Sequence, residues 1–244
     1  MQTNILGCYV DRVDMSGAMR KIETFIASGT PHHIITLNAE IIHKAQKDSK
    51  LKDIINQAHL VTPDGSGVVW AAEYLNSPVP ERVTGIDLTL ELARIGAAEG
   101  WSFYLYGAAP GVATATAEKL QEKYNDLKVI GTNHGFLSDT EKKAVIEDIK
   151  SKKPDILLVA LGAPNQEYWI SEHLKELQVP VCMGVGGSFD VISGKAKRAP
   201  KAFQKAGLEW FYRLIKEPHR MGRIMALPRF VIMVRLKGKK HTNS

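Results

Sequence analysis

The middle of the sequence alternates between short apolar runs and longer segments with helical periodicity, and this alternation limits the possible folds most. Between residues 102 and 185, four apolar runs are separated by three helical segments. Near-continuous apolar runs are typical of strands buried on both faces of a parallel sheet, because crossover helices cover both faces. We therefore expect an α/β fold here. The expected strands are 102–106, 128–131, 155–161 and 181–185, and the expected helices are 111–124, 139–150 and 165–177.

The first hundred residues extend the same pattern. A length of 244 residues and an apolar content of 44% suit one large domain, with or without an appendage. We expect a Rossmann-like, mostly parallel sheet covered by helices. The further strands are expected at 4–13, 32–39 and 59–62, and the further helices at 14–28, 40–47, 49–58, 87–99 and from the turn after residue 62 to about residue 76.

Two features favour a cytoplasmic protein. The chain shows no basic segment followed by an apolar stretch and a cleavage site, and no run of 18 apolar residues. Its two cysteines, Cys8 and Cys182, lie far apart and have no metal or redox spacing. We expect both to be buried thiols in a reducing compartment.

The last fifth of the chain differs in composition from the rest. Residues 195–244 hold 14 of the 32 Lys and Arg residues but only two of the 26 Asp and Glu residues. A basic segment of this kind indicates an anionic partner, such as nucleic acid, anionic lipid or a phosphorylated substrate. We therefore expect a catalytic core at 1–194 and a basic, amphipathic helical C-terminal appendage at 195–244.

Within this appendage, residues 224–236 form a strongly apolar run bracketed by Arg and Lys. The run is too short and too interrupted to span a bilayer, but it suits a helix lying in a membrane interface. The alternative is a C-terminal helix that packs on the core or in a homo-oligomer.

The stretch from Leu60 to Trp70 predicts a strand, a tight Pro63-Asp64-Gly65 turn and a helix. Pro63 removes a backbone donor, and glycine permits a bend that a Cβ would block. Asp64 would then lie at the carboxyl end of a strand, which is the edge where ligands bind in open α/β sheets. The alternative is that Asp64 only caps the helix.

Other strand ends carry polar or small residues. Thr36 and Asn38 are two apart and share a face near the exit of their strand. Glycines follow the strands at 107–111, 161–167 and 184–190, where tight turns can bring backbone N–H groups to a phosphate. None of these forms the G-x-G-x-x-G or G-x-x-x-x-G-K-[ST] pattern, so NAD binding and P-loop chemistry lack support.

The sequence also gives no indication of a bound metal. It contains no D-x-D pair, and its eight His residues show no metal-ligand spacing. A departing diphosphate would then need fixed cations, and the planar fork of arginine pairs well with phosphate oxygens. The candidates are Arg82, Arg213, Arg220 and Arg223, each of which is alternatively part of a solvated basic surface.

Seven stretches, spanning residues 36 to 214 in order, together resemble the WecG/TagA/CpsF glycosyltransferases, glycosyltransferase family 26. They are Thr36–Asn38 (TLN), Thr62–Val69 (TPDGSGVV), Glu81–Leu88 (ERVTGIDL), Gly162–Glu167 (GAPNQE), Gly184–Asp190 (GVGGSFD), Arg198–Pro200 (RAP) and Gly207–Leu214 (GLEWFYRL). Among its members, the chain is most similar to those that transfer N-acetylmannosamine at the start of the wall teichoic acid linkage unit.

The resemblance implies an inverting, metal-independent transfer of N-acetylmannosamine from its UDP donor to the 4-hydroxyl of GlcNAc on undecaprenyl diphosphate, without any cofactor. It implies that Asp64 is the base and that the enzyme acts at the inner face of the cell membrane through its appendage. The substrate-binding residues implied or suggested by position are Thr36, Asn38, Arg82, Gln166, Gly186, Gly187, Arg213, Arg220 and Arg223.

Other assignments stay open on the residues alone. The donor could instead be the uronic acid of N-acetylmannosamine, and the apolar tail could pair two copies off the membrane. An NAD-dependent sugar-nucleotide enzyme would need the G-x-G-x-x-G dinucleotide-binding motif, which is absent. A nucleic-acid-binding protein would fit the basic, aromatic tail, but no such module is recognisable, so we expect no nucleic-acid partner.

Overall fold

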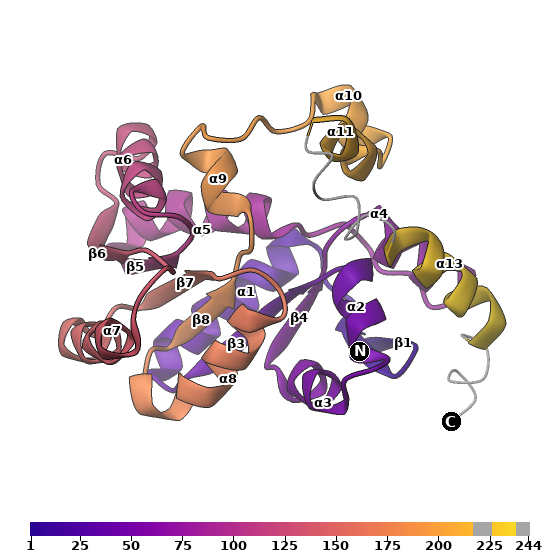
Figure 1. Ribbon diagram of the computed structural model, residues 1–244, viewed down its shortest axis with the longest axis horizontal. Helices are drawn as coiled ribbons and strands as arrows, with labels where there is room; N and C mark the ends of the chain where they lie inside the picture. The colour runs from indigo at the N-terminus through magenta and orange to yellow at the C-terminus, as the bar shows by residue number, and fades with distance from the viewer. Residues whose placement is uncertain (217–225, 238–244) are drawn as a thin grey trace.

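A computed structural model describes residues 1–216 and 226–237. Its centre is a six-stranded sheet in the order β4-β3-β8-β7-β5-β6, in which every neighbouring pair is parallel (Figure 1). This confirms the expected mostly parallel sheet. The strands are β3 (His32–Leu37), β4 (Leu60–Pro63), β5 (Ser102–Gly107), β6 (Lys128–Asn133), β7 (Ile156–Ala160) and β8 (Val181–Gly184).

Helices cover both faces of the sheet. Side chains of α1, α5, α6 and α9 form one apolar layer with the strands, and those of the remaining core helices form the layer on the opposite face. The first group is α1 (Met15–Ser28), α5 (Gly85–Glu99), α6 (Val112–Lys123) and α9 (Ser188–Ile192). The second is α2 (Ala39–Ala45), α3 (Ser49–Gln57), α4 (Ser66–Tyr74), α7 (Asp139–Lys152) and α8 (Asn165–Leu177).

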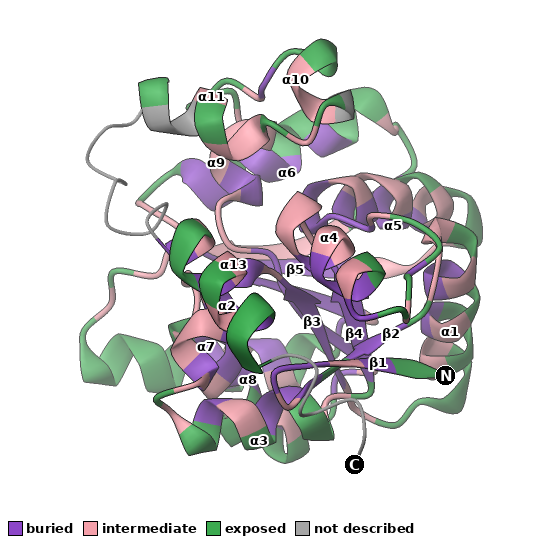
Figure 2. Ribbon diagram, turned by 90° about the vertical axis from the view of Figure 1, so that its right-hand side faces the viewer, coloured by how far each residue is buried: buried purple, intermediate pink, exposed green. Residues whose placement is uncertain are grey.

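The inner strands are largely apolar because both of their faces are covered, whereas edge strand β6 has no buried residue. In β3, Ile34 packs into the layer of α1 and α5, whereas Ile35 packs into the layer of α2 and α4, and both are completely buried. Successive side chains of a strand point to opposite faces, so one apolar run serves two cores. Figure 2 shows the buried strands between helices whose outer faces are exposed.

The N-terminal prediction of one strand over 4–13 is wrong. The segment forms an antiparallel hairpin of β1 (Gln2–Ile5) and β2 (Cys8–Asp11). Leu6 and Gly7 form its two-residue turn with φ of 56° and 83°, and positive φ at both positions is what a tight hairpin requires. The hairpin lies beside edge strand β4, where an Asp11 carboxylate oxygen accepts a hydrogen bond from Val61 N at 2.9 Å. As expected, Cys8 and Cys182 are buried and form no disulfide.

The last described helices lie beyond the sheet. The short helices α10 (Lys201–Lys205) and α11 (Glu209–Lys216) lie together above the carboxyl edge of the sheet (Figure 1). Helix α13 (Ala226–Lys237) packs on α2 and α4 and buries Phe230 and Val234 completely. One face of the apolar C-terminal segment therefore packs on the core. The opposite face keeps Ile232 and Leu236 exposed. Among the described residues, we find no helix with the length and hydropathy to cross a membrane.

Candidate active site

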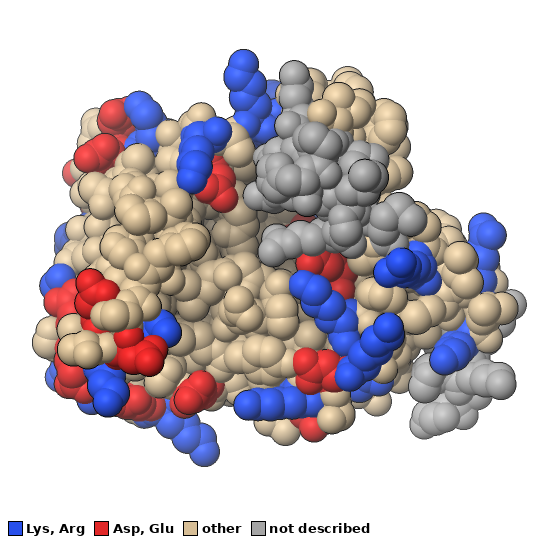
Figure 3. Space-filling model, in the orientation of Figure 1, with Lys and Arg blue, Asp and Glu red and all other residues tan. Residues whose placement is uncertain are grey.

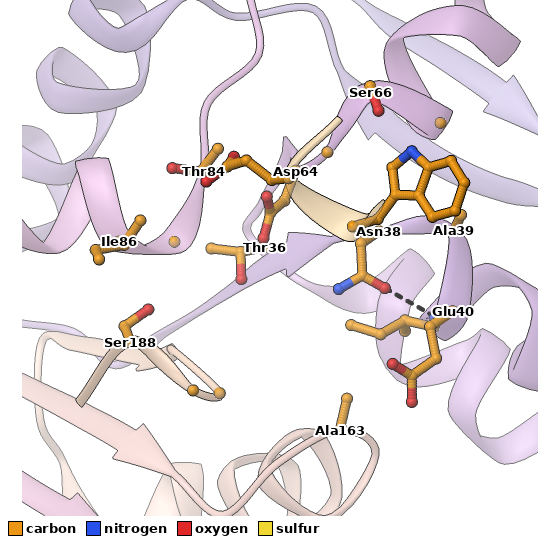
Figure 4. A pocket seen from close by; sticks show the side chains of 18 of the residues that line it. Thr36, Asn38, Ala39, Glu40, Asp64, Ser66, Thr84, Ile86, Ala163 and Ser188 are labelled. Carbon is orange, nitrogen blue, oxygen red and sulfur yellow. Dashed lines mark hydrogen bonds between the residues drawn. The ribbon is translucent and has the colours of Figure 1, made fainter. Parts of the chain in front are cut away.

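A cavity of about 300 Å³ opens at the carboxyl ends of β3, β4 and β8. The chain runs from β3 outward to β4, while β8, the last strand, inserts on the other side of β3. Loops therefore diverge on the two sides of β3, and a crevice at such a point is where open α/β sheets bind ligands. Figure 4 shows Thr36, Asp64 and Thr84 close together on one wall, with Ser188 and Ala163 on the opposite wall.

Asp64 lines this cavity at the end of β4. Its backbone N–H donates to Leu37 O at 2.9 Å, which holds the turn against β3. The N-cap of α4 is Gly65, with φ of 89° and no side-chain capping bond. Gly65, not Asp64, therefore holds the N-cap position of α4. The positive φ of Gly65 instead leaves the carboxylate on the cavity wall.

Thr36 and Asn38 lie on the same wall, and both side chains are held by the protein. Thr36 Oγ1 donates to Gly184 O at 3.2 Å, across the boundary between β3 and β8. Asn38 Oδ1 accepts from Ile41 N at 3.1 Å and caps α2 (Figure 4). These two hydrogen bonds fix the orientations of the Thr36 and Asn38 side chains, so this wall of the cavity is preorganised.

Gln166 and the glycines of the β8 loop form the opposite wall. Gln166 is 2% exposed, and its Oε1 accepts from Gly186 N at 3.0 Å. A Cβ at Gly184 would lie 2.6 Å from Gln166 Nε2. Position 184 must therefore be glycine for the Gln166 side chain to approach the backbone of β8. Gln166 in turn ties the start of α8 to the loop of Gly186 and Gly187.

Glu167 is a buried acid that sequence reasoning did not single out. Its Oε1 accepts from Gln166 Nε2 at 2.9 Å, whereas its Oε2 is buried without a hydrogen-bond partner. Burial raises the pKa of Glu167 to about 7, partly offset by the Gln166 hydrogen bond and by the charge of Lys44. Glu167 lies within the GAPNQE stretch, but a local pattern does not reveal that a helical Glu points inward.

Arg82 lines the cavity near Thr84 and is paired with an acid. Its Nη1 lies 2.7 Å from Glu209 Oε2, and Glu209 comes from the first turn of α11. The C-terminal segment thus contributes to the cavity, which Gly207, Trp210 and Leu227 also line. Ser66 Oγ donates to Gly207 O at 2.8 Å, beside the Asp64 turn. Sequence reasoning missed Glu209, because its partner lies 127 residues away.

The predicted site residues are brought together only in part. Thr36, Asn38, Asp64, Arg82, Gln166, Gly186 and Gly187 all line the cavity. Arg213 falls in α11, but its side chain is outside the described part of the structure, and Arg220 and Arg223 lie outside the described residues.

The described part of the chain holds no group of three or more His, Cys, Asp or Glu side chains arranged to bind a metal. The cavity instead presents carboxylate, amide, hydroxyl and guanidinium groups. On the face shown in Figure 3, a broad uncharged area lies left of centre, and charged side chains gather around it and to the right of centre.

Residues 3–244 match the family described as "Glycosyl transferase WecG/TagA/CpsF family". The chain belongs to this family. It is therefore a WecG/TagA/CpsF glycosyltransferase, and the cavity described above is its candidate active site.

Proteins similar to this chain come from Staphylococcus aureus. The proteins of strains MW2, NCTC 8325 / PS 47 and MRSA252 are each 35% identical over 235 residues, which cover 96% of this chain and 92% of the relative. Each is named "N-acetylglucosaminyldiphosphoundecaprenol N-acetyl-beta-D-mannosaminyltransferase".

Proposed function

We propose that this glycosyltransferase moves N-acetylmannosamine from UDP-N-acetylmannosamine to the 4-hydroxyl of GlcNAc on undecaprenyl diphosphate, forming the β-linked disaccharide of the wall teichoic acid linkage unit. The observation that carries the proposal is the 35% identity, over nearly the whole chain, to relatives named for this transfer. The cavity at the carboxyl edge of the sheet supports it, because it combines a carboxylate with a cation and fixed polar groups.

Asp64 is proposed as the general base. Inversion from an α-linked donor to a β-linked product needs one displacement at the anomeric carbon. The base removes the proton of the acceptor hydroxyl as its oxygen attacks, a contribution of roughly 10²–10⁴-fold in rate. The position of Asp64 on the cavity wall, pinned through Leu37 to β3, supports this role.

The departing UDP needs positive charge as the bond to the sugar breaks. Arg82 is proposed to supply part of it, together with Arg213, Arg220 and Arg223 of the appendage. One preorganised hydrogen-bond donor aimed at the developing charge lowers the activation barrier by about 3–4 kcal/mol. Thr36, Asn38, Gln166, Gly186 and Gly187 are proposed to position the donor. We propose that no divalent metal takes part.

The appendage, residues 195–244, is proposed to complete the site where the enzyme meets the inner face of the membrane. Exposed apolar side chains in its described part support membrane binding, and so does its basic composition. They are Leu208, Phe211, Ile215, Ile232 and Leu236. Off the membrane, the same surface would favour pairing of two copies.

A product assay tests this function. GlcNAc-diphospho-lipid acceptor is incubated with the full chain and either UDP-N-acetylmannosamine, its uronic acid or UDP-GlcNAc, each with and without EDTA. We expect a disaccharide-lipid product from UDP-N-acetylmannosamine alone, with a rate that EDTA leaves unchanged. Transfer only from the uronic acid would reassign the donor, and loss of activity in EDTA would refute the metal-independent mechanism.

A further inference from the structure

Four charged side chains meet where the cavity borders the start of α5. Arg82 Nη1 lies 2.7 Å from Glu209 Oε2, and Arg198 Nη2 lies 2.7 Å from Asp87 Oδ1. Asp87 Oδ2 also accepts a hydrogen bond from Thr84 Oγ1 at 2.6 Å. The cluster joins the loop before α5, the RAP stretch and the first turn of α11.

Glu209 lies between the two guanidinium groups but satisfies only one of them. Its Oε1 is 3.8 Å from Arg198 Nε, which is too long for a hydrogen bond. Arg198 Nε is buried and has no hydrogen-bond partner. A buried guanidinium N–H without an acceptor is costly, so this position favours a larger anion than one carboxylate.

Glu209 also faces the place where a diphosphate is proposed to bind. Both Arg82 and Glu209 line the cavity, whereas Arg198 is not among the lining residues. A diphosphate next to Arg82 would be repelled by the Glu209 carboxylate and would compete for the same N–H groups. Guanidinium groups match the oxygens of phosphate as well as those of carboxylate, so the competition is direct.

We propose that Arg82 and Arg198 form a two-guanidinium site for a diphosphate, and that the Glu209 carboxylate occupies this site until the ligand displaces it. The proposal rests on the proposed function for its ligand, and it adds Arg198 as a binding residue and Glu209 as an internal competitor. Displacement of Glu209 opens Arg198 Nε to a phosphate oxygen.

The arrangement couples ligand binding to helix α11. The contacts that hold the start of this helix near the cavity include Glu209 with Arg82 and Gly207 O with Ser66 Oγ at 2.8 Å. A diphosphate on Arg82 breaks the first contact and leaves the second. The ligand thereby frees the first turn of α11 while its preceding turn stays attached beside Asp64.

Both substrates of the proposed reaction contain a diphosphate, so the experiment has two arms. UDP and a water-soluble short-chain prenyl-diphosphate GlcNAc are titrated separately into the full chain by calorimetry. The variants are Glu209→Gln and Arg198→Gln. The matched control is Glu122→Gln, which removes a carboxylate from the exposed pair with Lys119 on α6.

The Glu209→Gln variant should bind at least one of the two ligands about tenfold more tightly than the wild type. The Arg198→Gln variant should bind the same ligand about tenfold more weakly. A tenfold change in affinity corresponds to about one charge-assisted hydrogen bond gained or lost. Glu122→Gln should bind like the wild type. A gain in affinity is not expected if Glu209 merely holds the fold. The ligand whose affinity changes identifies the source of the diphosphate.

A double variant tests whether the gain passes through Arg82. In an Arg82→Gln background, Glu209→Gln should improve affinity by less than about twofold, because the competing pair is already broken. Unchanged or weaker binding of both ligands by Glu209→Gln would overturn the inference while leaving the proposed function intact. A wild-type chain that binds neither ligand would overturn both.

Discussion

Asp64 is placed by two neighbours that have no chemical role of their own. Pro63 ends β4, and Gly65 takes a φ of 89° before α4 begins. A side chain with a Cβ rarely adopts such a φ. The Asp64 carboxylate therefore reaches the cavity because Gly65 can adopt this φ. The three residues Pro63, Asp64 and Gly65 are enough to predict this turn.

Replacing Asp64 by Asn separates its chemical role from its place in the turn. The introduced amide keeps the shape of the side chain but is not a base. We expect turnover to fall by about 10²-fold or more while UDP affinity stays within about twofold of the wild type. Single-turnover product formation and UDP calorimetry measure the two effects. Near-normal turnover would show that Asp64 is not the base.

The protonation of Glu167 should make stability depend on pH. Because its pKa in the folded protein is raised to about 7, folding retains a proton between about pH 4.5 and 7 that the unfolded chain releases. The free energy of unfolding therefore falls as pH rises through this window, at about 1.4 kcal/mol per pKa unit of difference.

Glu167→Gln should remove this dependence, because the Gln amide oxygen still accepts from Gln166 and carries no charge. Above pH 7 we expect the variant to be more stable than the wild type by about 3–3.5 kcal/mol, with the difference vanishing below about pH 4.5. Urea unfolding at several pH values measures it, with Glu172→Gln, an exposed position on the same helix, as the control. Equal pH profiles for Glu167→Gln and wild type would contradict the prediction.

At the scale of elements, the sequence predicted what depends on local chemistry. The helix expected at 14–28 is α1, capped by Asp14 and ended by Gly29 with φ of 65°. The first hairpin was misjudged because its alternating apolar residues read as one strand through Leu6 and Gly7. Contacts between distant elements, such as Arg82 with Glu209, depend on tertiary packing and leave no local signal.

Helix α13 has two faces that should respond differently to substitution. Phe230 is fully buried against the layer of α2 and α4, and Ile232 is 57% exposed. Phe230→Ala should lower the free energy of unfolding by roughly 3 kcal/mol, whereas Ile232→Ser should change it by less than about 0.5 kcal/mol. Denaturant titration tests the first effect.

The Ile232→Ser variant also tests membrane binding by the outer face. Vesicles containing anionic lipid should retain less of the Ile232→Ser variant than of the wild type in a sedimentation assay, since apolar area buried in the interface is lost. If Ile232→Ser binds vesicles as well as the wild type does, the outer face of α13 is not part of the membrane-binding surface.

At the scale of the whole molecule, we propose that residues 1–194 form a core that folds without the appendage. This core contains all six strands of the parallel sheet, the whole apolar layer of α1, α5, α6 and α9, and the opposite layer except for the side chains of α13. The cavity, in contrast, draws Gly207, Glu209, Trp210 and Leu227 from beyond residue 194.

Truncation after residue 194 should therefore give a protein that melts cooperatively but transfers no sugar. Its melting temperature should fall, because removal of α13 uncovers the apolar surface that Phe230 and Val234 bury. Circular dichroism melts and the product assay measure the two properties. A truncated chain as active as the full chain would refute the role of the appendage.

The position of β8 has a consequence for biosynthesis. Of the six strands in the parallel sheet it is the last to leave the ribosome, yet it lies between β3 and β7 and joins the two halves of the sheet. A nascent chain that ends before residue 181 lacks the strand that brings Gly186 opposite Asp64. Pairings across such sequence separations form slowly, so the sheet that carries the cavity can close only after nearly three-quarters of the chain has been made, and the appendage residues that complete the cavity follow later still.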